Sequence, residues 1–246
     1  MTQLSVRNLT SGYKRSDIIH NMTFEAQPGE LIALIGPNGS GKSTLMKTLI
    51  GQLPCKSGEI WVGKTPLEFF DIKERARELS YLPQSRVAMP EMSVMEILEL
   101  GRAPFRGRLG HISSTGRDVI NRIIKICALE AFTDRKFGEL SGGEQARALL
   151  GRMLVVDAPV ILADEPIAAL DPFYQLATLE ILKKEARRGK VVIVALHDLT
   201  LAAKFADQII VMNEGKLVSK GASAQFLSSN VIEQVFKVRW DDLVNQ

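Results

Sequence analysis

The stretch from Gly36 to Thr44 constrains the fold more than any other part of the sequence. It reads GPNGSGKST, follows the apolar run ELIALI (30–35) and precedes the helix-forming run STLMKTLIG. Glycines at this spacing let backbone N–H groups surround a phosphate chain, while Lys42 reaches the β- and γ-phosphates and the Ser43 hydroxyl can bind Mg²⁺. The motif predicts a strand, a phosphate-binding loop and a helix. The predicted nucleotide-binding residues are Gly36, Pro37, Asn38, Gly39, Ser40, Gly41, Lys42, Ser43 and Thr44.

A second apolar run, VILADEP (160–166), supplies two acidic residues. A strand there would place Asp164 at its C-terminal end, where a carboxylate can join Ser43 in holding Mg²⁺. Glu165 follows immediately and faces another way, so it can polarise an attacking water. Alternatively, both carboxylates cap the strand in a solvated turn. The phosphate loop upstream favours the metal-binding and catalytic interpretation.

Apolar strands alternate with helical patterns along the chain. The runs ELIALI, VILAD and KVVIVAL (190–196) are separated by helix-like segments, which predicts an α/β core with a largely parallel sheet. The segment 86–155 is mostly helical in pattern and includes SVMEILEL (93–100) and RDVINRIIKICALE (117–130). We interpret it as a helical insertion. The run 208–221 predicts a β-hairpin that turns at Asn213-Glu214-Gly215.

The sequence LSGGEQ places two glycines at the start of a predicted helix. Ser141 and Glu144 fit a capping box. Gly142 and Gly143 would then occupy the first turn, where glycine weakens a helix relative to alanine. This cost indicates bare N–H groups that an anion can approach at a helix N-terminus. A simple tight turn is the alternative.

Composition limits the remaining function classes. The chain has 246 residues, of which 46% are hydrophobic and 24% charged, as expected for a globular protein with a sizeable core. The net charge of +3 argues weakly for nucleic-acid binding, and no nucleic-acid partner is predicted. We expect no secretory signal and no membrane span. Cys55 and Cys127 lack metal or redox spacing, which favours a cytosolic setting with reduced thiols.

The phosphate loop, LSGGEQ and VILADEP in this order resemble the nucleotide-binding subunit of ATP-binding cassette (ABC) transporters over nearly the whole chain. The resemblance implies a P-loop NTPase (RecA-like) core with an N-terminal antiparallel β subdomain and an inserted α-helical subdomain. It implies a single ABC ATPase domain, 1–246. Residues 1–85 and 156–246 would form the core, and 86–155 the helical subdomain, which carries the family's signature motif, here LSGGEQ (140–145). ATP and Mg²⁺ are the implied cofactors.

The resemblance also assigns roles to single residues. Two cassettes of the family pair head to tail, so Ser141, Gly142 and Gly143 would bind the γ-phosphate of a nucleotide held by the partner copy. Tyr13, in SGYKR, resembles the aromatic residue that stacks on adenine. Asp171, in AALDP, matches the loop that crosses the dimer interface. A lone tyrosine would otherwise be read as ordinary packing.

Two further residues would complete the hydrolysis site. Gln84, in YLPQS, resembles the glutamine that touches Mg²⁺ and water while facing the membrane subunits. His197, in VALHDL, resembles the switch histidine on the γ-phosphate, although a structural role is the alternative for a histidine at a strand end. In the hydrolysis mechanism that the resemblance implies, Lys42, Mg²⁺ and His197 stabilise the charge that develops on the phosphate in the transition state, while Glu165 orients and activates the attacking water.

Two positions depart from the family pattern. Ala146 stands where glutamine usually follows the signature, and Ile167 stands where threonine or another small residue usually follows Asp-Glu-Pro. Neither carries the chemistry assigned above. Ile167 could change the packing of the loop that leads to Asp171, and with it the hydrolysis rate.

Several kinds of cassette protein remain possible. A chromosome-structuring ATPase would carry a long coiled coil, a translation-type protein two cassettes, and an exporter fused membrane helices. SVMEILELGRAPF (93–105) instead resembles importers of iron–siderophore, haem and cobalamin, through Leu100, Gly101, Arg102 and Pro104. The implied partners are a second cassette, two membrane-spanning permease subunits and a periplasmic or surface substrate-binding protein. The implied location is peripheral, at the cytoplasmic face of the bacterial inner (plasma) membrane.

Overall fold

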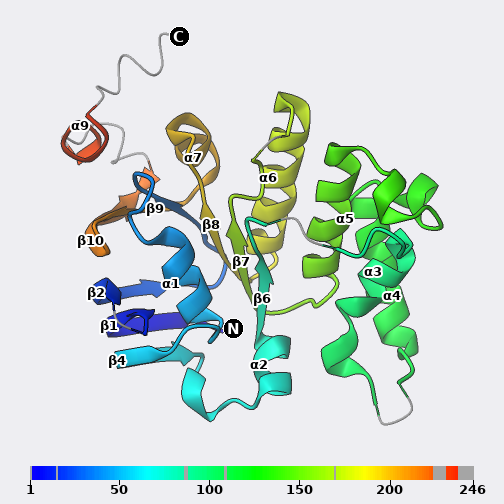
Figure 1. Cartoon of the computed structure of the whole chain (residues 1–246), viewed down its shortest axis with the longest axis horizontal. Coiled ribbons are helices and arrows are strands. Elements are labelled where there is room, and N and C mark those ends of the chain that lie inside the picture. Colours follow the sequence, from blue (N-terminus) through cyan, green and yellow to red (C-terminus); the bar gives the residue numbers. More distant parts are fainter. Residues whose placement is uncertain are drawn as a thin grey trace.

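The computed structural model describes residues 2–14, 16–85, 88–107, 110–168, 170–223 and 231–237. Its central sheet has the strand order β10-β9-β3-β8-β7-β6 (Figure 1). All neighbouring strands are parallel except β9 and β10, which form the predicted hairpin. The strands are β3 (Leu31–Ile35), β6 (Leu79–Leu82), β7 (Val160–Asp164), β8 (Val191–Ala195), β9 (Gln208–Asn213) and β10 (Lys216–Ala222).

A second, antiparallel sheet has the order β2-β1-β4-β5 and confirms the expected N-terminal β subdomain. Its strands are β1 (Leu4–Tyr13), β2 (Ser16–Ala26), β4 (Cys55–Val62) and β5 (Thr65–Pro66). The backbone N–H of His20 on β2 donates to the carbonyl of Gly215 in the β9–β10 turn, at 2.9 Å. The two sheets therefore meet beside the hairpin.

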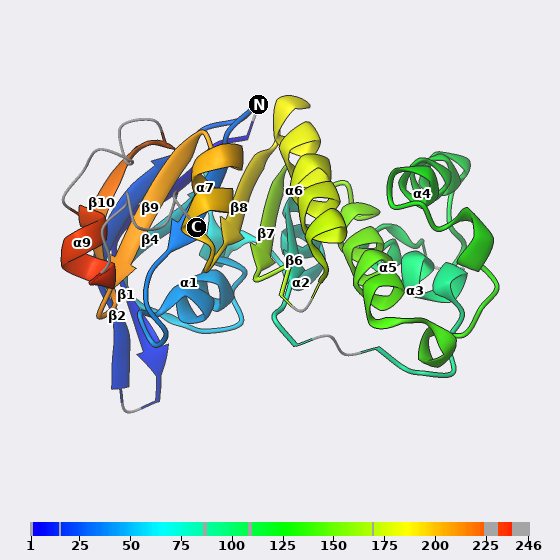
Figure 2. The same cartoon turned by 90° about the horizontal axis from the view of Figure 1, so that it is seen from above.

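The central sheet is covered on both faces, which explains why its strands are almost wholly apolar. On β3, Leu31, Ala33 and Ile35 belong to one hydrophobic cluster, while Ile32 and Leu34 belong to the other. The first cluster includes side chains from α6 and α7, and the second includes α1 and the N-terminal sheet. Figures 1 and 2 show these layers on the two sides of the sheet.

The helices follow the predicted alternation. They are α1 (Lys42–Leu49), α2 (Ile72–Glu78), α3 (Val94–Leu100), α4 (Ser114–Ile126), α5 (Gly142–Leu154), α6 (Pro172–Arg187), α7 (Leu199–Phe205) and α9 (Val231–Phe236). Short 3₁₀ turns are η1 (Leu67–Phe69), η2 (Ala103–Phe105), η3 (Glu130–Phe132) and η4 (Phe137–Glu139). Among these described helices, none is long and apolar enough to cross a membrane.

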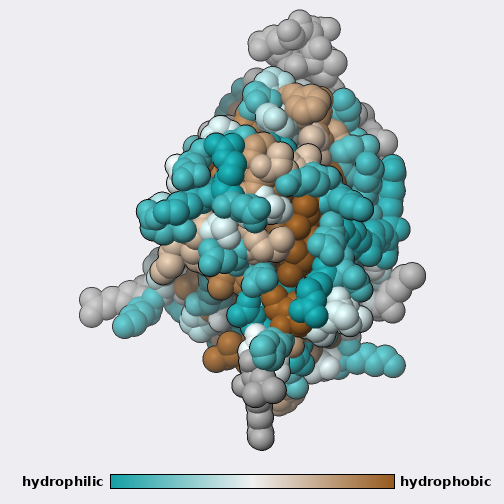
Figure 3. Space-filling model, turned by 90° about the vertical axis from the view of Figure 1, so that its right-hand side faces the viewer, coloured by the Kyte–Doolittle hydropathy of each residue, from teal (hydrophilic) through white to brown (hydrophobic). Residues whose placement is uncertain are grey.

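The helices α3, α4 and α5 lie together beyond the β6 edge of the sheet (Figures 1 and 2). The face they form carries an apolar strip between hydrophilic side chains (Figure 3). Ser93 and Ser141 cap α3 and α5 through the predicted capping boxes. The helical pattern of 117–130 is shifted, because α4 runs from Ser114 to Ile126 and Ala128 then adopts a φ of +50°, which ends the helix. The division at 86–155 stays an interpretation.

Candidate functional site

The phosphate loop follows the buried strand β3, and its carbonyl groups hold the Lys42 side chain by hydrogen bonds. The Lys42 Nζ donates to the carbonyls of Gly36 at 2.7 Å and Pro37 at 3.2 Å. Lys42 is only 6% exposed, and burial lowers its pKa, while the carboxylates of Glu165 and Asp164 act in the opposite sense. The loop therefore keeps a cation ready beside its own backbone N–H groups, as a phosphate chain requires.

Close packing explains two of the loop glycines. A Cβ on Gly36 would lie 2.3 Å from the Met212 carbonyl oxygen on β9 and 2.6 Å from Ser40 Oγ. Gly41 has a φ of +101°, and a Cβ there would lie 2.9 Å from the Ile19 side chain. A side chain at Gly36 would push the loop away from β9 and change its curvature.

A pocket of about 360 Å³ lies in front of the loop. It collects most of the sequence-predicted nucleotide residues, together with Gln84 and Glu165 from beyond the loop. Its lining is Tyr13, Ile18, Asn38, Gly39, Ser40, Gly41, Lys42, Ser43, Thr44, Gln84 and Glu165. Gly36 and Pro37 instead support Lys42 from behind. Tyr13 lies at the end of β1 and is 49% exposed, so its ring is available for stacking.

Asp164 ends β7 as an almost fully buried carboxylate, 1% exposed. Its Oδ2 accepts a hydrogen bond from the Tyr81 hydroxyl at 3.3 Å, and its Oδ1 has no hydrogen-bond partner among the described residues. Burial raises the pKa of Asp164, whereas the Ser43 hydroxyl nearby lowers it. An orphaned carboxylate oxygen beside a hydroxyl fits a hard cation such as Mg²⁺, which keeps phosphate and water among its other ligands.

Glu165 sits between two side chains that the sequence predicted for the same site. Gln84 Nε2 donates to Glu165 Oε2 at 2.7 Å, and Glu165 Oε1 contacts His197 Nε2. These residues follow β6, β7 and β8, whose C-terminal ends meet at one edge of the parallel sheet. Glu165 has a φ of +51°, uncommon for a residue other than glycine and often found at functional sites.

Tyr81 is a site residue that the motifs did not reveal. It lies on β6, opposite Leu162 of β7, and donates its hydroxyl to Asp164. Burial and the adjacent carboxylate raise the pKa of Tyr81 above its usual range, so the phenol stays protonated as a donor. The only sequence feature that could have pointed to Tyr81 is its position three residues before Gln84. Its contact with Asp164 depends on the register between β6 and β7.

The signature residues lie outside this pocket. Ser141 caps α5 and exchanges hydrogen bonds with Glu144. A Cβ on Gly142 would meet nothing within 4 Å, and one on Gly143 would make ordinary contact with Tyr174 at 3.6 Å. Packing within the described chain does not require a glycine at either position. Their predicted role toward a second nucleotide remains a prediction.

Asp171 also lies outside the pocket, as the N-cap of α6. Its Oδ1 accepts from the Tyr174 backbone N–H at 3.1 Å. The two positions that depart from the family pattern, Ala146 and Ile167, are buried, with 7% and 8% of their surface exposed. Ile167 belongs to the main hydrophobic cluster, so its larger side chain is accommodated by packing.

The Leu-Gly-Arg-x-Pro pattern joins α3 to the C-terminal end of α5. A Cβ on Gly101 would lie 2.3 Å from both the Arg152 carbonyl oxygen and a Val155 methyl group. Arg102 is 8% exposed and donates from Nη1 to the carbonyls of Val155 at 2.9 Å and Val156 at 3.1 Å. Its guanidinium also stacks over Phe105, 3.9 Å from the ring centroid. The pattern therefore caps the C-terminal end of α5, because Arg102 donates to the carbonyls of the C-cap residue Val155 and of Val156 just beyond it.

The fold and the phosphate-loop site define a P-loop NTPase of the ATP-binding cassette type. The ABC transporter family model matches residues 19–168. The chain is 34% identical over 233 residues to a hemin import ATP-binding protein from Thermobifida fusca, covering 95% of this chain and 81% of that protein. It is 30% identical over 240 residues to a ferric enterobactin transport ATP-binding protein from Escherichia coli K12, covering 97% and 89%.

A solved structure shows the same fold. The dimeric structure of an ATP-binding cassette in a post-hydrolysis state, bound to ADP and Pi, aligns with a TM-score of 0.79 and 28% identity, covering 89% of this chain and 98% of that one. The chain belongs to the ABC transporter family. It is an ATP-binding subunit that hydrolyses ATP to drive transport.

Proposed function

We propose that the chain powers a multi-subunit importer of a ferric siderophore or a related iron chelate, with haem and cobalamin as the next candidates. The observation that carries the catalytic part is the Glu165 carboxylate, which lies beside the phosphate loop between Gln84 and His197. The importer part is supported by the relatives, which are named for hemin import and ferric enterobactin transport. It is also supported by the Leu-Gly-Arg-x-Pro pattern.

In the proposed reaction, water attacks the γ-phosphate of ATP, the bond between the γ-phosphorus and the β,γ-bridging oxygen breaks, and ADP and inorganic phosphate leave. Tyr13 stacks on adenine, and the loop N–H groups and Lys42 bind the phosphates. Ser43, Asp164 and Gln84 would hold Mg²⁺, which would neutralise charge on the phosphate oxygens. Glu165 would orient the water and accept its proton. His197 contacts the other oxygen of the Glu165 carboxylate from the one that Gln84 binds, and it would donate to the γ-phosphate once ATP is bound.

The second half of the site would come from another copy of the chain. Gly142 and Gly143 form the first turn of α5 after the N-cap Ser141, whose own N–H donates to Glu144 Oε2, and the space around Gly142 is open. An anion bound by a partner copy can approach there without displacing a side chain, and the helix N-terminus favours it. The related cassette that crystallised as a dimer supports this pairing. Asp171, at the start of α6, would lie at the same interface.

The assembly would also contain two membrane-spanning permease subunits and a periplasmic or surface substrate-binding protein. The chain would bind peripherally at the cytoplasmic face of the inner membrane. ATP would join two cassettes and hydrolysis would release them. The permease subunits would respond to these two states, joined and separated, of the interface between the cassettes. The transported chelate would contact the permeases and the binding protein rather than this chain.

The variant Glu165→Gln tests the catalytic and transport roles together. It retains the size of the side chain but removes the base, so steady-state hydrolysis should fall by at least about 10²-fold while ATP affinity stays within a few-fold. In cells, the same variant should stop uptake of a labelled ferric siderophore. Glu180→Gln, an exposed position on α6, is the matched control. Hydrolysis within tenfold of wild type would contradict the catalytic assignment, and siderophore uptake that persists would contradict the transport assignment.

A further inference from the structure

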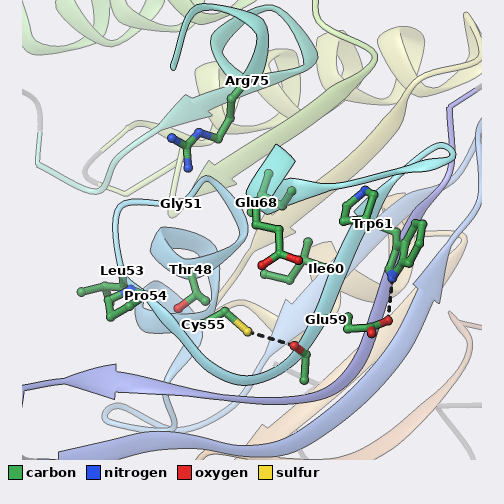
Figure 4. Close-up of a pocket in the computed structure, with 13 residues that line it drawn as sticks. Thr48, Gly51, Leu53, Pro54, Cys55, Glu59, Ile60, Trp61, Glu68 and Arg75 are labelled. Carbon is green, nitrogen blue, oxygen red and sulfur yellow. Dashed lines mark hydrogen bonds between the residues drawn. The ribbon is translucent and has the colours of Figure 1, made fainter. Parts of the chain in front are cut away.

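A second cavity, of about 260 Å³, lies at the opposite end of α1 from the phosphate loop (Figure 4). It is bounded by the C-terminal end of α1, the following loop, β4, η1 and Arg75 of α2. None of its lining residues lines the nucleotide pocket. The cavity is therefore separate from the nucleotide pocket, and ligand binding there is independent of the proposed transport function.

Part of the wall of this cavity is apolar. Leu53 and Pro54 form one side, and Ile60 and Leu67, which are 4% and 7% exposed, form another. Trp61 lies beside them (Figure 4). A ligand with an exposed apolar group would bury that group here, and the burial would favour binding.

Most polar groups around the cavity already have partners within the protein. The Thr48 hydroxyl donates to the Thr44 carbonyl at 2.8 Å. Glu59 Oε2 accepts from the Trp61 indole N–H at 2.8 Å. The Cys55 thiol donates to the Ser57 carbonyl at 3.2 Å. These groups therefore do not need a ligand to satisfy their hydrogen bonds.

Two charged side chains differ from this pattern. Among the described residues, Glu68 and Arg75 make no side-chain hydrogen bond or ion pair, either with each other or with another residue. Figure 4 shows the Glu68 carboxylate pointing into the cavity, with the Arg75 guanidinium across it. The guanidinium lies against the backbone of Gly51, where an added Cβ would be 1.9 Å from Nη1. Arg75 is thus held at one end by packing.

The two charges give the cavity a positive and a negative end. At the negative end, burial raises the pKa of the Cys55 thiol, and Glu68 and Glu59 raise it further, so the thiol remains neutral. A ligand with only an anionic group would bring it toward Glu68, and one with only a cationic group would leave Arg75 without a partner. A neutral apolar ligand would cover both charges without pairing either, which is costly.

We propose that this cavity binds a small amphipathic zwitterion of the α-amino-acid class. Its carboxylate would pair with the Arg75 guanidinium, whose planar fork suits two carboxylate oxygens. Its ammonium group would pair with Glu68. Its apolar side chain would pack on Leu53, Ile60 and Leu67. No covalent step is involved.

The test uses the purified full-length chain without nucleotide and L-leucine as the probe. Calorimetry should show saturable binding with a Kd near or below about 1 mM. Two analogues each lack one charge: 4-methylpentanoate has no ammonium group, and 3-methylbutylamine has no carboxylate. Each should bind at least tenfold more weakly than leucine. The absence of saturable leucine binding at about 10 mM would overturn the proposal.

Two variants assign each charge to its partner. Glu68→Gln and Arg75→Gln should each weaken leucine binding at least tenfold. In addition, Glu68→Gln should no longer distinguish leucine from 4-methylpentanoate, and Arg75→Gln should no longer distinguish leucine from 3-methylbutylamine. Glu180→Gln and Arg117→Gln, both exposed and outside the cavity, are the charge-matched controls.

Retained ATP binding shows that each variant is folded, because neither charge lies in the nucleotide pocket. If leucine binding is equal in wild type and both cavity variants, the site is wrong even though binding occurs. If either control weakens binding as much as the cavity variants do, the effect is not local and the proposal also fails. None of these results bears on ATP hydrolysis, so the proposed transport function is tested separately.

Discussion

Replacing Arg102 by alanine should destabilise the protein without affecting its nucleotide chemistry. Arg102 is almost fully buried and donates to the carbonyls of Val155 and Val156 at the end of α5. It also stacks on Phe105. Arg102→Ala removes all three interactions and leaves two helix-end carbonyls without this donor. The nucleotide pocket contains none of these residues, so ATP affinity should stay within a few-fold.

The size of the effect follows from the contacts. A hydrogen bond to a charged group contributes about 1.5–3 kcal/mol. The Val156 carbonyl is only partly buried and can be hydrated after the substitution, so we count one such bond in full. The cation–π contact adds about 1 kcal/mol. The total loss is about 3 kcal/mol, and for a chain of this length it lowers Tm by about 6–12 °C.

Thermal unfolding followed by circular dichroism measures this change. Arg117→Ala, an exposed position on α4 outside this contact, is the matched control and should change stability by less than about 0.5 kcal/mol. Arg102→Lys keeps the charge but loses the planar fork, so its Tm should be intermediate. A decrease in Tm no larger for Arg102→Ala than for Arg117→Ala would refute the capping role.

Two other predictions concern the phosphate site. Gly142→Asp should fold and bind ATP as the wild type does, because a Cβ there meets open space. It should nevertheless abolish ATP-driven dimerisation, measured by size-exclusion chromatography, since a carboxylate would face the partner's γ-phosphate. Normal dimerisation would show that the signature does not act across the interface. Asp164→Asn should raise the Tm of the nucleotide-free chain by a few degrees, because it removes a buried charge whose Oδ1 lacks a partner, while it should reduce Mg²⁺-dependent hydrolysis. An unchanged or lower Tm would show that Lys42 and Ser43 already compensate that charge.

The phosphate loop, and the side chains that meet at the C-terminal edge of the parallel strands, were predictable because each depends on residues close together in sequence or directly after a strand. The loop motif is contiguous, and residues that follow neighbouring parallel strands must meet at one sheet edge. This rule explains why Gln84, Glu165 and His197 converge although they are far apart in the chain. The capping boxes of α3 and α5 are equally local and were also predictable.

Features that depend on packing between distant segments were not predictable in the same way. Tyr81 reaches Asp164 only because of the register of β6 against β7. The resemblance identified the pattern around Arg102, but its capping of α5 requires the two helix ends to be adjacent. The second cavity depends on Arg75 lying over Gly51, a contact between segments with no shared motif.

The strand order of the central sheet has a consequence for synthesis on the ribosome. Strand β3, which precedes the phosphate loop, is synthesised early. Its hydrogen-bonded neighbours β8 and β9 lie in the C-terminal part of the chain and are synthesised much later. Strands β1, β2 and β4, by contrast, are close in sequence and can pair with one another while translation continues. Long-range pairing of this kind is slow and leaves apolar strand edges open. A nascent chain that stops before Val191 would therefore leave β3 unflanked and the loop without a fixed shape.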